Sequence, residues 1–136
     1  MSTTLADAID RFDVDVHEHL DRGLEIPVLS GPQRQGDVIV LPRRVPAATT
    51  KVPPAGVPVV RGEAGGNTHL LLADGDVFFD VKPVSATDLV LGVLTVAGGS
   101  TAYLAHPEHG YMGFAAGTYE ARRQREQADE LRLVAD

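Results

Sequence analysis

The sequence predicts a mainly β protein: a single small antiparallel barrel or sandwich with an N-terminal amphipathic helix. The chain has 136 residues, the size of one domain, and contains 14 Gly and 9 Pro, most of which divide residues 31–117 into short pieces. Those pieces are rich in Val, Leu, Phe and Tyr, which favour strands. Helical spacing of apolar residues is clear only near the N-terminus. Together these observations indicate short strands that follow one helix.

Residues 4–22 carry the apolar stripe of a helix, with Thr3 or Thr4 as its cap and Gly23 at its end. The stripe can lie on the protein's own core, or it can dock on a partner. Its positions follow one another at spacings of three and four: Leu5, Ala8, Ile9, Phe12, Val16 and Leu20. A partner-binding helix face would consist of Leu5, Ile9, Phe12 and Val16.

The middle of the chain predicts a series of strands with turns between them. The Pro-rich stretch 46–58 is expected to be an extended loop. The pairs Asp74-Gly75 and Gly98-Gly99 are expected to form hairpin turns. Strands are expected at 38–41, 58–63, 68–73, 76–82, 88–97, 100–105 and 111–115.

Charge and composition limit the classes of function. A formal net charge of −7 argues against nucleic acid as a partner, because phosphates require a basic surface. The sequence contains no Cys, so disulfides and thiolate metal sites are excluded. No apolar run approaches the ~20 residues that span a bilayer, and the N-terminus lacks the pattern of a signal peptide. We therefore expect a cytoplasmic protein that does not bind membranes.

Four stretches carry a resemblance to a known group of proteins. They are "RQGDVIVLP" (34–42), "RGEAGGNTH" (61–69), "HPEHG" (106–110) and "GTYEARRQREQ" (117–127). In this order they resemble small, uncharacterised bacterial and phage-associated proteins with the motifs RQGDV, GE.TGH.H, HEEH and PG.Y.V.RQREY. Asn67 replaces the first histidine of GH.H, and Gln127 replaces the final aromatic residue.

The resemblance implies a domain type rather than a reaction. It implies a compact β domain over residues 33–136, preceded by an added helix and linker over residues 1–32. It also implies a strand at 117–127, where composition alone fits a strand or a helix. If the protein were a component of a phage-derived particle, it would be found in that particle instead of free in the cytoplasm.

Three histidines form a candidate metal site. His106 and His109 lie on either side of a Pro-Glu pair, and His69 follows the "GGN" stretch at the start of an expected strand. Three imidazoles around an ion at Zn–N distances of about 2.0–2.1 Å would leave one position for water. Zn, Fe or Mn would suit such a site, and no organic cofactor is expected. Oxygen ligands could come from Asn67, Glu63 or Glu108. Alternatively, the histidines are ordinary polar residues of loops.

Arginines near the C-terminus form a second candidate site. Arg122, Arg123 and Arg125 could bind a phosphate or a carboxylate of a partner. Alternatively, nearby glutamates such as Glu120 and Glu126 neutralise them on a sheet surface.

The absence of a complete catalytic set favours a non-enzymatic binding or assembly module. Such a module would act in a homo-oligomer or in a larger complex with a protein partner. The serines lack a G-x-S-x-G motif, and no catalytic residue can be assigned. The alternative is a metal-binding protein, or a metal-dependent enzyme or sensor, that uses the histidine cluster.

Overall fold

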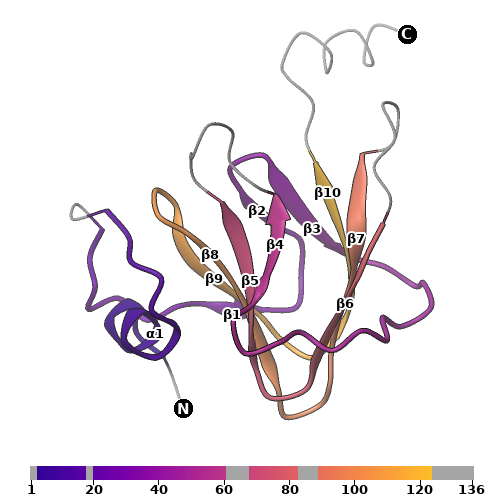
Figure 1. Ribbon diagram of the computed structural model, residues 1–136, viewed down its shortest axis with the longest axis horizontal. Coiled ribbons are helices and arrows are strands. Elements are labelled where there is room, and N and C mark those ends of the chain that lie inside the picture. The colour runs from indigo at the N-terminus through magenta and orange to yellow at the C-terminus, as the bar shows by residue number, and fades with distance from the viewer. Residues whose placement is uncertain (1–2, 18–19, 61–67, 83–88, 124–136) are drawn as a thin grey trace, which may run out of the picture.

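The computed structural model describes residues 3–17, 20–60, 68–82 and 89–123, and shows two five-stranded sheets packed as a sandwich (Figure 1). The first sheet has the order β1 (Val28–Leu29), β9 (Gly110–Phe114), β8 (Thr101–His106), β5 (His69–Asp74) and β4 (Val57–Val60). The second has the order β2 (Gln33–Gln35), β3 (Val38–Pro42), β10 (Gly117–Arg123), β7 (Val90–Val96) and β6 (Val77–Val81). All strand pairs are antiparallel except β1–β9. The predicted mainly β sandwich is confirmed.

The first sheet is covered on both faces, which explains the continuous apolar sequence of its central strands. In β5, Leu71 points into the core between the sheets, while Leu72 joins a second cluster on the outer face. In β8, Leu104 and Tyr103 divide in the same way. Strands buried on both faces lose the alternation of apolar and polar residues.

The second sheet is covered on one face and keeps that alternation. Its inward side chains include Val38, Phe79, Leu94 and Tyr119, which form the inter-sheet core with residues of the first sheet. Their sequence neighbours are half-buried or exposed. Period-two burial of this kind is what one solvated face produces.

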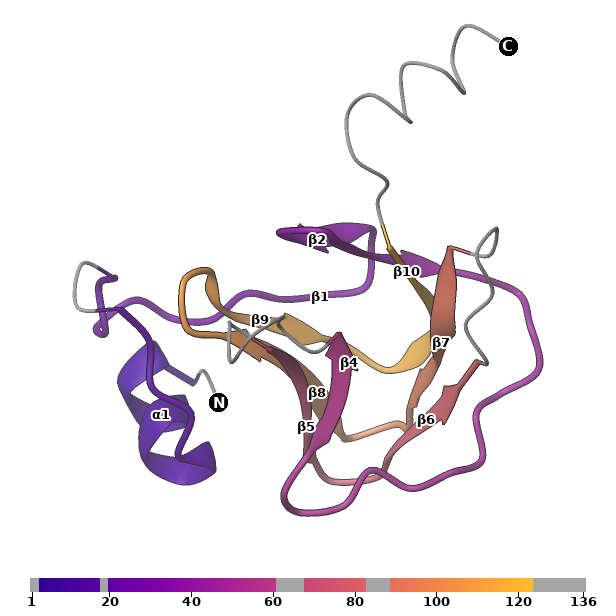
Figure 2. The same cartoon turned by 45° about the horizontal axis from the view of Figure 1, so that its top comes forward.

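Helix α1 (Leu5–Phe12) lies on the outer face of the first sheet, opposite the second sheet (Figure 2). Thr4 and Asp7 form a reciprocal capping box at its start. The helix ends at Phe12, because Asp13 adopts φ 58° and donates its N–H to the carbonyl of Ile9. The predicted helix over 4–22 with an end at Gly23 is therefore wrong in its second half.

The predicted apolar helix stripe is covered by the protein itself. Leu5 and Val16 are buried, and Ile9 and Phe12 pack against the same cluster over Tyr103 and Tyr111. Val16 reaches this cluster from an irregular segment, where β-branched residues disfavour further helix. Because the sheet occupies this face, we do not propose Leu5, Ile9, Phe12 and Val16 as a partner-binding surface.

The glycine turns predicted as hairpins have another role. Asp74-Gly75 carries the chain from β5 in the first sheet to β6 in the second, and Gly98-Gly99 carries it back from β7 to β8. The consecutive strands that pair with each other are instead β2–β3, through Gly36 and Asp37, β4–β5, β6–β7 and β8–β9. Patterns of turn residues mark a reversal of direction but not the sheet that the next strand joins.

The ends of the domain add two further findings. The expected strand at 117–127 is observed as β10 over Gly117–Arg123, and residues 124–127 lie outside the described part. Strand β1 joins residues Val28–Leu29 to the first sheet, so the N-terminal segment contributes a strand as well as a helix. Within the described residues, no helix is long and apolar enough to cross a membrane.

Candidate metal centre

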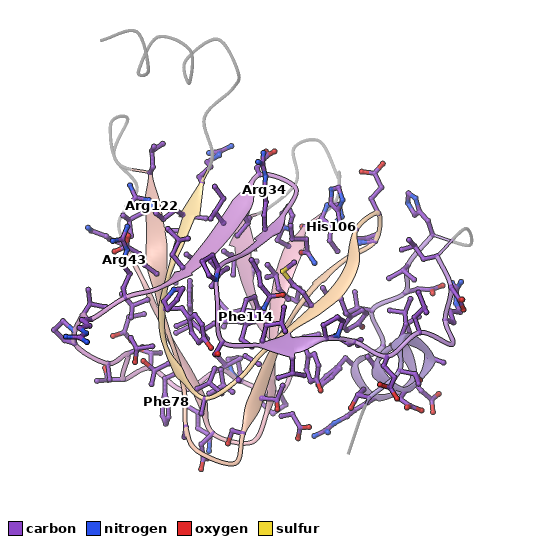
Figure 3. The ribbon with its side chains drawn as sticks, turned by 180° about the vertical axis from the view of Figure 1, so that it is seen from behind. Arg34, Arg43, Phe78, His106, Phe114 and Arg122 are labelled. Carbon is purple, nitrogen blue, oxygen red and sulfur yellow. The ribbon has the colours of Figure 1, made fainter. Side chains whose placement is uncertain are left out.

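The strand register brings the three predicted histidines to one end of the sandwich. His69 begins β5, and His106 ends the neighbouring antiparallel strand β8, where Leu70 pairs with Ala105. In an antiparallel pair, the start of one strand lies beside the end of the other. His109 follows in the turn that leads to β9, and Figure 3 shows His106 at this end of the sandwich.

The turn between β8 and β9 is held by one of the histidines. His106 pairs with Gly110, whose φ of +80° suits glycine. The Nδ1 atom of His106 accepts hydrogen bonds from the backbone N–H groups of Glu108 at 3.1 Å and His109 at 3.3 Å. The His106 side chain therefore organises the loop that carries the other candidate ligands.

The three imidazole rings form a compact cluster, which we call the histidine cluster (His69, His106 and His109). The ring centroid of His106 lies 4.3 Å from that of His69 and 4.5 Å from that of His109. The centroids of His69 and His109 are 6.3 Å apart. His69 and His106 are 37 positions apart in the sequence, and their rings are in contact across β5 and β8.

Gln35 orients the histidine cluster from the other sheet. Its side chain is only 3% exposed, and its amide nitrogen donates to the carbonyls of Leu104 at 2.9 Å and Gly110 at 3.1 Å. The amide oxygen therefore faces His69 Nδ1, 2.9 Å away, which must donate its proton. This bond leaves the lone pair of His69 on Nε2. A metal-binding histidine usually donates the N–H of its other ring nitrogen to an oxygen acceptor in the same way.

Gly36 lets the rings approach the β2–β3 turn. Its φ is +55°, and a Cβ atom there would lie 3.0 Å from His109 Nε2 and 3.3 Å from His69 Cε1. A side chain at this position would therefore press on two rings at once. Gln35 and Gly36 were not predicted as site residues, although both belong to the quoted "RQGDV" stretch; the resemblance to that motif was the signal that could have found them.

The part of the chain that carries the histidine cluster matches a known domain family. Residues 34–124, more than half of the chain, match the family described as a domain of unknown function, DUF8820. The chain belongs to this family. No curated protein and no solved structure matches it significantly. The DUF8820 region includes Gln35, Gly36 and all three members of the histidine cluster, whereas α1 and β1 precede it.

Burial favours the uncharged form of two members of the histidine cluster, His69 and His106. It lowers the pKa of His69 to about 4, with smaller contributions from the charges of His106 and His109. Burial also lowers the pKa of His106, and the charges of His109 and His17 act in the same direction, while Glu108 and Asp37 oppose this shift. Both side chains are therefore neutral at pH 7, the form that binds metal ions.

The oxygen ligands predicted from the sequence divide into two groups. Glu108 lies in the turn, and one of its oxygens and one nitrogen each of His106 and His109 lie within 4.8 Å of one another. Ligand atoms of a tetrahedral zinc ion are about 3.3 Å apart, so small movements would bring these three atoms together. Glu63 and Asn67 lie outside the described residues.

The protonation of His106 sets a condition on metal binding. Since its Nδ1 accepts two N–H groups, a neutral His106 carries its proton on Nε2. An ion could bind at Nε2 only if the proton moved to Nδ1, where it would face the N–H groups of Glu108 and His109. His69 is thus ready to bind an ion, whereas His106 becomes available only when the turn changes.

One arginine of the predicted arginine site is paired within the DUF8820 domain. Arg122 lies 2.9 Å from Glu120, and Arg43 lies 3.9 Å from the same carboxylate. Arg123 is exposed at the end of β10, and Arg125 lies outside the described residues. Arg122 therefore forms an ion pair with Glu120, as expected if nearby glutamates neutralise the arginines on the sheet surface.

Proposed function

We propose that this protein binds a divalent transition-metal ion at the histidine cluster. The observation that supports this most directly is the hydrogen bond from His69 Nδ1–H to the buried Gln35, which leaves the Nε2 lone pair of His69 available beside the ring of His106, whose centroid lies 4.3 Å away. Contact between the buried rings of His69 and His106 is otherwise unfavourable for protonation, because a proton on one ring repels a proton on the other.

The ligands that we propose are His69, His109 and Glu108, with His106 joining after rearrangement. His69 offers Nε2, and His109 and Glu108 are exposed in the turn, where their side chains can move. Imidazole with one carboxylate suits zinc, iron or manganese, and leaves a position for water. Asp37, which favours the charged form of His69 and His106, adds negative potential for a cation.

Binding would change the β8–β9 turn. Recruiting His106 removes the acceptor of the Glu108 and His109 N–H groups, so these groups must find water or another acceptor. A site that alters an exposed turn on loading suits a metal-responsive binding protein, and we propose this role ahead of hydrolysis.

Titration calorimetry with ZnCl2, on protein first treated with chelator, tests the proposal. We expect about one ion per chain. His69→Ala and His109→Ala should each weaken zinc binding by more than ~100-fold, because loss of a residue that only hydrogen-bonds to a metal ligand already costs about 10–100-fold. Asp74→Ala is the control, because Asp74 carries a potential ligand at the opposite end of β5 from His69 and should leave the affinity unchanged.

Amide NMR spectra of the same samples test the role of the turn. Zinc should shift the Glu108 and His109 N–H signals more than those of the β5–β6 turn. The metal proposal would be refuted if zinc did not bind the chelator-treated protein. It would also be refuted if His69→Ala and His109→Ala bound zinc as tightly as wild type.

A second candidate function, a binding or assembly module, is supported by an apolar surface at the edge of the first sheet. Val28 and Leu29 of edge strand β1 are 41% and 49% exposed, and nearby Leu24 is 62% exposed. An exposed apolar edge strand is suited to pairing with another chain, as in a homo-oligomer or a phage-like particle.

Light scattering at rising protein concentration tests this second function. We expect an oligomer that Val28→Lys converts to a monomer, while Val81→Lys, at an exposed apolar residue on the other sheet, does not. A monomer at all concentrations would argue against self-assembly.

A further inference from the structure

A cavity of about 180 Å³ lies beside the histidine cluster, between the N-terminal segment and β9. His109 and Gly110 form one side of it, and the other sides come from residues that precede the DUF8820 match. The cavity therefore exists only because the segment around Leu20–Pro27 packs against the β domain. It is open to solvent on the side of Leu24, which is 62% exposed.

The wall of the cavity is apolar. Leu20, Leu24 and Ile26 line it from the N-terminal segment, and Tyr111 lines it from β9. Ile26 and Tyr111 are buried at 6% and 8% exposure, so these two surfaces are fixed by packing in the second cluster. The Tyr111 hydroxyl donates to the carbonyl of Val14 at 2.8 Å and is therefore already satisfied. A ligand would accordingly meet mostly hydrocarbon.

The charged lining residues are acidic. Asp21 and Glu25 border the cavity, and its described lining contains neither Lys nor Arg. One oxygen of Asp21 accepts from the Gly23 N–H at 2.9 Å, whereas the Glu25 carboxylate makes no hydrogen bond or ion pair to any described residue. Arg22, between them in sequence, is turned away, because it pairs with Asp15 at 3.1 Å and donates to the Val16 carbonyl at 2.9 Å. The rim thus favours a positive charge and disfavours a carboxylate or phosphate.

The volume limits the size of a ligand. A water-sized group occupies about 30 Å³, so the cavity holds roughly six such groups. This is smaller than the ~300–1,000 Å³ of sites for drug-sized molecules. A single ring or a chain of about six carbons fits this space.

We propose that the cavity is a binding site for a small organic cation, a primary ammonium group carried by a six-carbon ring or chain. The hydrocarbon part lies against Leu20, Ile26 and Tyr111, and the ammonium group lies at the rim beside Asp21 and Glu25. The site does not depend on a metal ion, and it belongs to the N-terminal segment as much as to the DUF8820 domain.

Amide NMR titrations of the full-length protein in EDTA at low salt test this proposal. The probes are cyclohexylammonium, cyclohexanol and cyclohexanecarboxylate, which share one ring and differ in charge. We expect the ammonium probe to shift signals of Leu24, Ile26 and Tyr111, and to bind about two- to five-fold more tightly than the alcohol. The carboxylate should bind more weakly than both.

Two substitutions test the parts of the site separately. Glu25→Gln should remove most of the preference for ammonium over alcohol, while Asp10→Asn, an exposed acidic position on α1 away from the lining, should retain it. Leu24→Ala should weaken all three probes by a similar factor, whereas Val81→Ala, another exposed apolar residue, should not. The spectra of the variants report directly whether the fold is kept.

Three results would overturn the proposal: no shift at the lining residues with any probe, a carboxylate that binds at least as tightly as the ammonium, or an ammonium preference that survives Glu25→Gln. None of these results bears on zinc binding, since EDTA is present throughout. Failure of this inference is therefore distinguishable from failure of the metal proposal.

Discussion

Gly36 controls how closely the rings of His69 and His109 approach the β2–β3 turn. We predict that Gly36→Ala destabilises the fold by about 1–2 kcal/mol, because a positive φ disfavours a side chain, and that it also weakens zinc binding. Gly99→Ala is the matched control, since Gly99 has φ +79° with no atom within 4 Å of an added Cβ. Urea unfolding gives the first quantity and calorimetry the second. Equal zinc affinity in the two variants would contradict a role for ring spacing.

Single residues also show which part of the site could be predicted. The histidines were found because imidazoles are rare in the chain and two of them flank one turn. Gln35 was not found, since nothing in a local pattern distinguishes a glutamine that is 3% exposed from one on the surface. Its importance arises from three partners on β5, β8 and β9, which only the folded sandwich brings together.

At the level of elements, Tyr111 of β9 fastens the N-terminal segment to the first sheet. We predict that Tyr111→Phe costs about 1 kcal/mol, since it removes the bond to the Val14 carbonyl and leaves that carbonyl without this donor. Hydrogen exchange should accelerate in residues 5–26 more than in β5 or β7. Tyr103→Phe is the control, because the Tyr103 hydroxyl makes no hydrogen bond within the described residues. Similar effects of both substitutions would contradict this anchoring role.

The apolar runs predict strands β5 and β8, which are buried on both faces, as well as strands whose burial alternates, but they do not predict where the helix ends. Strands β3, β6 and β7 alternate buried and half-buried residues, as the sequence indicates, and β10 does the same, although the resemblance rather than the pattern predicted that strand. The predicted helix is longer than the observed one because Val16 and Leu20 belong to the same apolar cluster as Leu5. Both residues reach that cluster from an irregular segment. An apolar stripe indicates which residues are buried. A residue in the left-handed conformation, such as Asp13, can end the helix while the apolar residues that follow it remain buried.

The whole molecule is a stack of three layers, in which α1 and its segment cover the first sheet and the first sheet covers the second (Figure 2). The histidine cluster lies at the end of this stack, where Gln35 of the second sheet contacts β5, β8 and β9 of the first. Protonating His69 therefore places positive charge at the junction of both sheets. Its titration should be measurable as a change in the stability of the entire fold.

We predict that acid destabilises the protein partly through His69. Its pKa is about 4 when folded, against an ordinary value of 6.5, so the unfolded chain binds more protons between these values. The free energy of unfolding therefore falls as the pH drops from 6.5 to 4, by on the order of 2–3 kcal/mol for this residue, and the lowered pKa of His106 acts in the same direction. Urea unfolding in EDTA at pH 7.5, 5.5 and 4 measures the effect.

Carboxylates contribute to the same acid transition, so the comparison between variants is what tests His69. The Thr49 and Thr50 backbone N–H groups that bind Asp80 lower the pKa of that carboxyl group, and protonating it also costs stability. This contribution is shared by wild type and His69→Gln, so the difference between their pH profiles isolates the histidine. The profile of His69→Gln should be flatter than that of wild type between pH 6.5 and 4. Parallel profiles for wild type and His69→Gln would show that the buried imidazole does not govern the stability of the sandwich.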